Sequence, residues 1–283
     1  MEIIDNHRSC IFRKPTRSAC GFCFIALLLC SCSNTTINKE GKVEELPEFQ
    51  VSTIQFADSI AGEDGASYFK AEIDVPVGGP DTLVQNIQNW INEELGGSYT
   101  GALNCDSNMM RNYARDFFEN ELDDAFPGSG TEYDINRVAE NDLYVSYMIE
   151  GYIYTGGAHG MPVTSGVTFA KKTGKKFGWD MFNDGSVLRD QIKNALIQQF
   201  FEGNREAFDN ATEIMVKDPD QFPLPETDPW LVDDSVQFVY QAYEIAPYSV
   251  GQPMCRLAVK DVLYAFSEQA KYALLYRVEE EER

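Results

Sequence analysis

A histidine among glycines is the residue with the clearest chemical potential in this sequence. It lies in "YTGGAHGMP", Tyr154 to Pro162, and the chain beyond residue 31 has no histidine other than His159. An imidazole can act as a general base or bind a metal ion, but both roles need partner side chains positioned by the fold. The neighbouring sequence supplies only Thr155. We therefore predict a structural His159 that hydrogen-bonds backbone within the loop, with catalysis or metal binding as the alternative.

The glycines around His159 favour a turn. Gly156, Gly157 and Gly160 are expected to supply positive φ between two paired strands. Three tyrosines precede this turn on one face of an alternating run, namely Tyr144, Tyr152 and Tyr154. Their rings could stack on sugars or anchor a protein partner. The alternative is that this face lies under helices, with the hydroxyl groups at the edge of the core.

Familiar catalytic and metal-binding patterns are incomplete in the sequence. A glycosidase needs two carboxylates across a cleft, but 45 acidic residues make some pair almost certain, so sequence cannot locate one. No G-x-S-x-G nucleophile motif occurs, and "DPDQFPLPETDPW" lacks the ligand spacing of a calcium loop. Two cysteines and one histidine far apart are a weak pattern for zinc. We therefore expect no metal and no cofactor.

The elements that would position these residues follow from periodicity. Residues 68–75 alternate as a half-buried strand, and residues 81–95 place apolar side chains at helical spacing, with a cap at Asp81 or Thr82 and a stop at Gly96. A second helix is expected at 106–125. Strands are expected from Thr131 to about residue 170, a helix at 186–201, further strands at 235–248 and 254–259, and closing helical turns.

The N-terminus resembles an export signal. Four basic residues precede the apolar run at 19–29, which is too short to span a membrane comfortably, and "LCSC" then resembles a lipobox with Cys32 as the lipidated residue. An ordinary secretory signal is the alternative. Residues 32–48 are polar and are predicted to form a flexible tether. Outside the leader and Cys32 only Cys105 and Cys255 remain, and they form either a disulfide or two buried free thiols.

The net charge of the chain indicates which classes of partner it can bind. The formal net charge is −22, and the 1–31 leader holds four Lys/Arg and two Asp/Glu, so the chain from Cys32 onward carries −24. Such a surface repels phosphates, which excludes nucleic acid as an expected partner. A cationic protein fits the charge better. We expect a monomer anchored to a membrane only by its lipid.

Together the elements predict an α+β fold in which helices pack on largely antiparallel sheets. The expected architecture is a two-layer sandwich made of two tightly associated sub-modules. We place the leader at 1–31, the tether at 32–48, an N-terminal α+β module at 49–162 and a C-terminal α/β module at 163–283.

Three stretches carry a family resemblance. These are "YTGGAHG", "VTFAKKTGKKFGWDMF" and "VQFVYQAYEIAPYSVGQP". They resemble the RsiV-like exported bacterial proteins, which combine a deacetylase-associated N-terminal module (DUF4163) with a C-terminal two-layer module (DUF3298). The resemblance covers about Phe49 to Tyr276 and implies a Bacteroides-type lipoprotein of the cell envelope. Some relatives bind lysozyme, some look like accessory modules of peptidoglycan deacetylases, and some are named xylanase-like.

Two classes of function follow from the resemblance and the residues. The favoured class is a non-catalytic binding or sensing module of the cell envelope, for a peptidoglycan-related ligand or a cationic protein such as lysozyme. We expect it on the outer membrane, facing the periplasm or the surface. The alternative is a carbohydrate-active hydrolase of the peptidoglycan or xylan type, using a carboxylate pair that the sequence does not locate.

Overall fold

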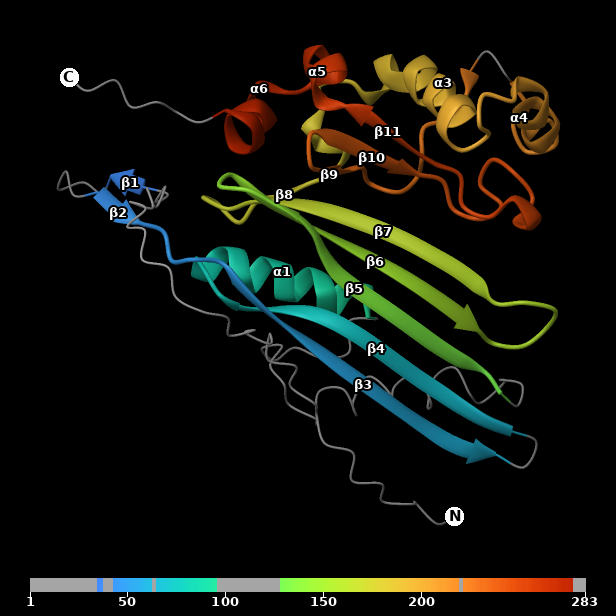
Figure 1. Ribbon diagram of the computed structural model, residues 1–283, viewed down its shortest axis with the longest axis horizontal. Coiled ribbons are helices and arrows are strands. Elements are labelled where there is room, and N and C mark those ends of the chain that lie inside the picture. The colour runs from blue at the N-terminus through green and yellow to red at the C-terminus, as the bar shows by residue number, and fades with distance from the viewer. Residues whose placement is uncertain (1–34, 38–42, 63–64, 96–127, 219–220, 277–283) are drawn as a thin grey trace, which may run out of the picture.

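Figure 1 shows a computed structural model of the chain, which describes residues 35–37, 43–62, 65–95, 128–218 and 221–276. The described part contains a long sheet, a smaller sheet and helices that cover both. The expected helix at 106–125, together with Cys32 and Cys105, lies outside these residues. No helix among the described ranges has both the length and the apolar character needed to cross a membrane.

The long sheet has six strands in the order β3-β4-β5-β6-β7-β8. All neighbours are antiparallel except β4 and β5, which are parallel. In β4 the predicted alternation is confirmed, because Phe69, Ala71, Ile73 and Val75 are all buried. The strands are β3 (Gln50–Gly62), β4 (Gly65–Gly78), β5 (Gly130–Glu140), β6 (Tyr144–Tyr154), β7 (Met161–Ala170) and β8 (Lys176–Phe177).

Helix α1 (Asp81–Glu94) covers one face of this sheet, as predicted from its apolar spacing. Its buried side chains are Leu83, Ile87, Trp90 and Ile91, and they join the β4, β6 and β7 side chains in one core. The expected cap is wrong. Pro80 is the N-cap residue and makes no side-chain cap, while Asp81 already lies in the first turn. Proline suits the start of a helix because the missing N–H would have had no partner there.

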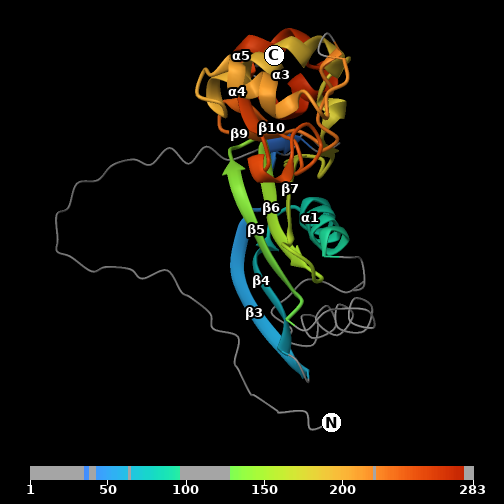
Figure 2. The same ribbon diagram turned by 90° about the vertical axis from the view of Figure 1, so that its right-hand side faces the viewer.

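A second layer lies over one end of the long sheet, on the face opposite α1, and β3 and β4 extend away from it (Figure 2). Its three-stranded sheet has the order β11-β10-β9. Helix α3 packs on β11, and the layer shares its apolar core with residues of the long sheet, including Tyr144, Ala170 and Phe177. The elements are α3 (Arg189–Gln199), α4 (Arg205–Thr212), β9 (Trp230–Val232), β10 (Ser235–Val239), β11 (Met254–Ala258), α5 (Val259–Val262) and α6 (Glu268–Ala270).

Strand β6 shows how one sheet serves both layers. Val145, Tyr147 and Ile149 pack in the core under α1. The alternate residues face the C-terminal layer, where Met148 packs against Trp230 of β9. Because successive side chains point to opposite faces of a strand, β6 is buried on both sides over much of its length. The α+β class with largely antiparallel sheets and two closely packed parts is therefore confirmed.

Three boundaries differ from the expectation. Residue 162 lies inside the β6–β7 hairpin, so the long sheet continues to Phe177 and the C-terminal layer begins after it. Within the segment predicted to be a tether, β1 (Thr35–Ile37) pairs with β2 (Val43–Glu45). The strand expected at 235–248 ends at Val239. The chain turns there because the Glu244 carboxylate accepts hydrogen bonds from the backbone of Gln241 and Glu226.

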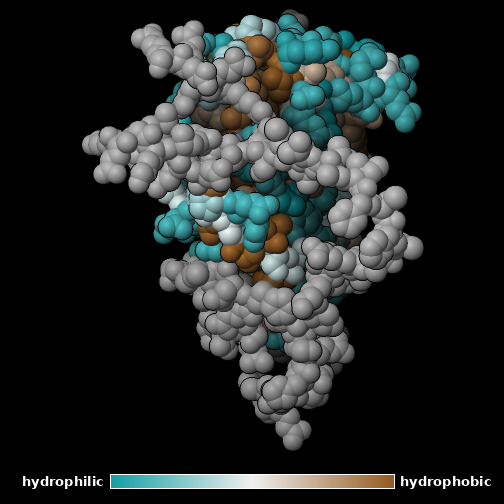
Figure 3. Space-filling view, turned by 60° about the vertical axis from the view of Figure 1, so that its left-hand side comes forward, coloured by the Kyte–Doolittle hydropathy of each residue, from teal (hydrophilic) through white to brown (hydrophobic). Residues whose placement is uncertain are grey.

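The surface in Figure 3 is mixed, with hydrophobic patches between hydrophilic areas on the described residues. Several large apolar or aromatic side chains are exposed, and they are not evenly spread. Tyr152, Met161 and Tyr243 belong to the tip of the β6–β7 hairpin and the loop that contacts it, as the next section describes. A second exposed group, Tyr272 and Tyr276, lies near the C-terminus, where the two rings contact each other edge to face.

Candidate functional site

The glycine-histidine stretch is the connection of the β6–β7 hairpin, as predicted. Ile153 pairs with Met161, so the chain reverses over residues 154–160. Gly156 and Gly157 have φ values of 113° and 90°, a region that favours glycine, and the Tyr154 hydroxyl donates to the Gly157 carbonyl at 3.0 Å. Two of the three predicted turn glycines therefore act through positive φ.

Gly160 acts differently from the prediction, because its φ is not positive. A glycine is needed here because the Tyr152 ring and the Ile153 carbonyl lie close to its Cα atom. A Cβ atom here would lie 2.5 Å from Cζ of Tyr152 and 2.7 Å from the Ile153 carbonyl oxygen. The Gly160 N–H donates to the Tyr152 hydroxyl at 2.8 Å, so a side chain at this position would disrupt the contact that closes the loop.

His159 meets a partner from a distant segment. Its imidazole stacks on the Tyr248 ring with centroids 3.6 Å apart and planes 15° from parallel. Nδ1 lies 3.0 Å from the Gly160 carbonyl oxygen, which is the backbone contact predicted from the sequence. The Tyr248 hydroxyl donates to the same carbonyl at 2.8 Å, and the Tyr243 hydroxyl lies 3.5 Å from Nε2. Two of the three stretches that carry the family resemblance, "YTGGAHG" and "VQFVYQAYEIAPYSVGQP", therefore contact each other here.

We call Tyr152, His159, Tyr243 and Tyr248 the Tyr–His patch. Tyr152 and Tyr243 expose 39% and 44% of their surface, although the Gly160 N–H bonds the hydroxyl of the first and the Tyr248 ring contacts the second. Tyr243 also has φ of 71°, an uncommon conformation for a bulky residue and one that often marks functional positions. The sequence identified Tyr152 and His159. It missed Tyr243 and Tyr248, although both lie in the "YEIAPY" stretch.

The other two predicted tyrosines are outside this patch. Tyr144 is buried beneath the C-terminal layer, and its hydroxyl donates to the Asp233 carbonyl at 2.8 Å. Burial, together with the charges of Asp233 and Asp234, raises the pKa of Tyr144 to about 12. This is the core-edge arrangement that the sequence left open. Tyr154 is half-buried, and its hydroxyl donates to the Gly157 carbonyl within the hairpin loop.

Replacing His159 by alanine should lower stability modestly. The change removes the stack on Tyr248 and the contact with Gly160, which together contribute about 1 kcal/mol. Thermal melting of wild type and His159→Ala would measure the loss. His159→Phe keeps an aromatic ring and should recover most of it. A variant that melts like wild type would contradict the structural role.

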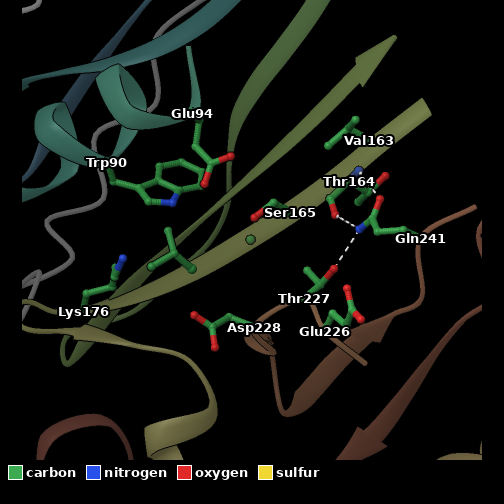
Figure 4. A pocket seen from close by; sticks show the side chains of 12 residues that line it. Trp90, Glu94, Val163, Thr164, Ser165, Lys176, Glu226, Thr227, Asp228 and Gln241 are labelled. Carbon is green, nitrogen blue, oxygen red and sulfur yellow. Dashed lines mark hydrogen bonds between the residues drawn. The ribbon is translucent and has the colours of Figure 1, made fainter. Parts of the chain in front are cut away.

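A second candidate is an open cleft of about 430 Å³ between α1, strand β7 and the loop before β9 (Figure 4). No local pattern in the sequence indicates this cleft, because its walls come from five separate stretches of chain. Glu94 of α1 and Asp228 of the loop line it from opposite sides, with Ser165 of β7 between them. The lining residues are Trp90, Glu94, Val163, Thr164, Ser165, Gly166, Val167, Lys176, Glu226, Thr227, Asp228 and Gln241.

A glutamine fixes one end of this cleft. Gln241 Nε2 donates to the Thr164 carbonyl at 2.6 Å and to the Thr227 hydroxyl at 2.7 Å. Its Oε1 accepts from the Thr164 N–H at 3.3 Å and from the Gln252 side chain at 2.7 Å. The amide therefore ties strand β7 to the loop, and Figure 4 shows both of its donor contacts.

Glu94 is the carboxyl whose environment is most unusual in the cleft. Burial raises its pKa above the ordinary value of 4.5, against the opposing effects of the Lys176 ammonium and a hydrogen bond with Trp90. The folded protein therefore holds this proton more tightly than the unfolded chain. Stability from Glu94 is present at low pH and is lost as pH rises above 4.5 through the raised value.

Glu94→Gln should consequently change the pH dependence of stability. The amide does not titrate, so the melting temperature of the variant relative to wild type should be higher at pH 7 than at pH 4. Melting curves across this range would test the sign. Glu93→Gln, an exposed neighbour on the same helix, controls for the lost helix charge. An equal difference at both pH values would contradict the assignment.

Of the two cysteines predicted to form a disulfide or two free thiols, the structure describes Cys255. Cys255 is buried, and its thiol donates to the Ile192 carbonyl at 3.7 Å, while burial raises its pKa to about 12. Because Cys105 lies outside the described residues, the alternative of a disulfide stays a prediction. Within the described residues, no group of three or more His, Cys, Asp and Glu side chains is arranged to hold a metal ion.

Comparison with known proteins finds a family model that matches part of this chain. Residues 179–258 match the family model described as "Protein of unknown function (DUF3298)". This range contains much of the C-terminal layer, including Asp228, Gln241 and the two tyrosines that contact His159. A comparison with curated proteins finds no significant match.

Two solved structures share the fold. A DUF3298 family member from Bacteroides fragilis aligns with a TM-score of 0.63 and 18% identity, covering 78% of this chain and 94% of its own. A DUF3298 family protein from Pseudomonas aeruginosa aligns with a TM-score of 0.56 and 19% identity, covering 79% and 96%. At such identities the likeness concerns the fold alone. The N-terminal DUF4163 assignment stays a prediction, whereas residues 179–258 match the DUF3298 model and the chain shares the fold of two solved DUF3298 structures.

Proposed function

We propose that this protein is a lipid-anchored cell-envelope protein that binds, without catalysis, a peptidoglycan-related ligand or a cationic protein such as lysozyme. The observation that carries this proposal is the Tyr–His patch. The rings of His159, Tyr243 and Tyr248 contact one another at the tip of the β6–β7 hairpin, and Tyr152 joins them through the backbone of Gly160. Two of the tyrosines, Tyr152 and Tyr243, are exposed.

The patch has the properties of a prepared binding surface. The rings of His159, Tyr243 and Tyr248 contact each other. The hydroxyl groups of Tyr152 and Tyr248 are fixed by the backbone of Gly160. Fixed aromatic rings lose little conformational freedom on binding and offer a large contact area to a sugar ring or a protein side chain. The unusual backbone of Tyr243 holds an exposed ring at a cost in strain, which argues for a role beyond packing.

Charge supports a basic partner. The chain from Cys32 onward carries −24 when the leader is removed from the formal charge of −22. Opposite charge accelerates encounter with a cationic protein and makes binding sensitive to salt. A neutral glycan would depend on the patch alone and would show little salt dependence. The salt response therefore separates the two kinds of ligand.

The binding experiment uses residues 33–283, titrated with lysozyme and separately with soluble peptidoglycan and xylan fragments. Saturable binding that falls at least about tenfold in Tyr243→Ala supports the patch, since aromatic anchors often contribute 2 kcal/mol or more. Tyr272→Ala removes another exposed tyrosine outside the patch and should bind like wild type. Unchanged binding by Tyr243→Ala would remove the patch from the proposal.

The carboxylates that line the cleft are the observation that favours the hydrolase alternative. Glu94 has a pKa raised by burial, as a general acid requires, and Asp228 provides a second carboxylate across the cleft. If the protein is a hydrolase, the same incubations should release cleaved fragments. Glu94→Gln and Asp228→Asn should then abolish cleavage. Binding without any product would leave the non-catalytic function in place.

The lipid anchor is tested in cells. Wild-type protein should incorporate radioactive palmitate, and Cys32→Ser should abolish the label, because the thioether at this residue would be the attachment point. Cys30→Ser, two residues earlier in the leader, should retain the label. Labelling that persists in Cys32→Ser would contradict the lipobox assignment and favour an ordinary secretory signal.

A further inference from the structure

Among the described residues, one edge of strand β7 lacks a pairing strand along the floor of the cleft. On its other side β7 pairs with β6 from Met161 to Ala170. On the cleft side β8 pairs only with Thr168 and Phe169. An edge strand exposes backbone N–H and C=O groups that can pair with another chain or a ligand. The stretch before Thr168 is therefore a row of backbone groups facing the cleft.

At Thr164 a side-chain amide takes the place of the missing strand. Gln241 offers its Nε2 to the Thr164 carbonyl and its Oε1 to the Thr164 N–H, at 2.6 and 3.3 Å. One amide thus satisfies both backbone groups of an edge residue. The Gln241 contact therefore shows that the open edge of β7 can pair with an amide group.

Gly166 presents the same pair of groups without such a partner. Backbone direction alternates along an antiparallel strand, so the N–H and C=O of Gly166 point to the cleft like those of Thr164. Gly166 is buried and lines the cleft, yet none of the described residues bonds to these two groups on that side. Buried backbone groups left unpaired are costly, and the great majority in folded proteins find a partner.

The shape of the site directs a ligand to the edge. The Trp230 ring lies over Gly166, where a Cβ atom would come within 2.1 Å of Cδ2. A ligand must therefore approach in the plane of the sheet, between Gln241 and β8. The cleft volume of about 430 Å³ lies within the ordinary range for small-molecule sites.

The walls add charge selectivity. Within the part of the chain that the structure describes, the cleft is lined by three carboxylates, from Glu94, Glu226 and Asp228, and one ammonium, from Lys176, which gives a net charge of −2. Figure 4 shows the Glu94 and Asp228 side chains on opposite sides of the β7 edge. Charge-assisted hydrogen bonds to carboxylates are stronger than neutral ones, so a cationic group near Gly166 would be favoured.

We propose that this cleft binds a short peptide or amino-acid amide that carries a free ammonium group. The ligand amide pairs with the N–H and C=O of Gly166, as the Gln241 amide does at Thr164. The ammonium lies between Glu94 and Asp228. This site is separate from the Tyr–His patch, so the inference goes beyond the proposed function and does not depend on it.

The probe for this site is L-alanyl-L-lysinamide, which has both an amide and ammonium groups. Titration calorimetry with the full chain in detergent should show saturable binding. N-acetyl-L-alanyl-L-norleucinamide has the amides without the cation, and 1,5-diaminopentane has the cations without an amide. Both should bind at least about tenfold more weakly, since each loses one of the two contacts. Equal binding of either control would overturn the proposal.

Substitutions and amide exchange locate the contact. Glu94→Gln and Asp228→Asn should each weaken the probe about tenfold, whereas Glu93→Gln, exposed on the same helix, should not. The probe should also slow hydrogen exchange at the Gly166 N–H, and 1,5-diaminopentane should not. Binding that leaves Gly166 exchange unchanged would show that the amide pairing is wrong. Tyr243→Ala should bind the probe like wild type, which keeps this test independent of the patch.

Discussion

Trp230→Ala should lower the free energy of unfolding by about 3 to 5 kcal/mol, the range for removing a buried aromatic side chain. Trp230 is fully buried in β9 and packs with Val232 and Val239 against Val138 and Met148 of the long sheet. It is thus a main apolar contact between the two layers. A loss of this size is a large share of the stability of an ordinary domain.

Chemical unfolding followed by circular dichroism would measure this loss. Trp230→Phe is the matched control, because it keeps a ring in the same space. It also removes an indole N–H that has no hydrogen-bond partner among the described residues, which lowers its cost further. We expect Trp230→Phe to be clearly more stable than Trp230→Ala. A loss below about 1 kcal/mol for the alanine variant would mean that the indole is not a core contact.

Gly166→Ala should disrupt the packing of β7 against the Trp230 ring, here by a change in β7. The new methyl group would lie 2.1 Å from Cδ2 and 2.5 Å from Cε2 and Cε3 of the Trp230 ring. The ring is buried and the β7 backbone is paired to β6, so neither side moves easily. Overpacking of this kind costs about 3 kcal/mol. We therefore expect Gly166→Ala to unfold at much lower denaturant concentration than wild type.

Gly78→Ala is the control for this second prediction. Its Cβ atom would meet its nearest neighbour, Cβ of Gln50, at an ordinary 3.4 Å, so stability should change by less than about 1 kcal/mol. Combining Gly166→Ala with Trp230→Ala should cost less than the sum of the single changes, because the methyl group then enters the space of the indole. Strict additivity would show that the two positions do not touch.

Local sequence patterns predicted helices and strands well where the apolar side chains recur at a regular spacing. The spacing of Leu83, Ile87 and Ile91 identified α1, and alternation identified β4 and the β6–β7 hairpin. The N-cap was missed because Asp81 and Pro80 both suit a helix start, and only the backbone angles decide between them.

The sites were less predictable because they depend on distant contacts. His159 was identified from its glycine neighbours, but its stacking partner Tyr248 lies in the other layer. Nothing local to Glu94 or Asp228 indicates that both line one cleft. The open backbone at Gly166 is invisible in sequence, because pairing depends on where β8 ends.

The parallel pairing of β4 with β5 determines the order in which this molecule can assemble. The hairpin β3–β4 and the meander β5–β6–β7 each join strands that are close along the chain, and such hairpins form within microseconds. The seam between them brings together Ser67 and Ser129, whose hydroxyls lie 3.0 Å apart although 62 residues separate them. Closing so long a loop costs conformational entropy before the hydrogen bonds between β4 and β5 can form. Such long-range strand pairing is therefore slow. We therefore expect the six-stranded sheet to form late in folding, when the two halves pair along β4 and β5.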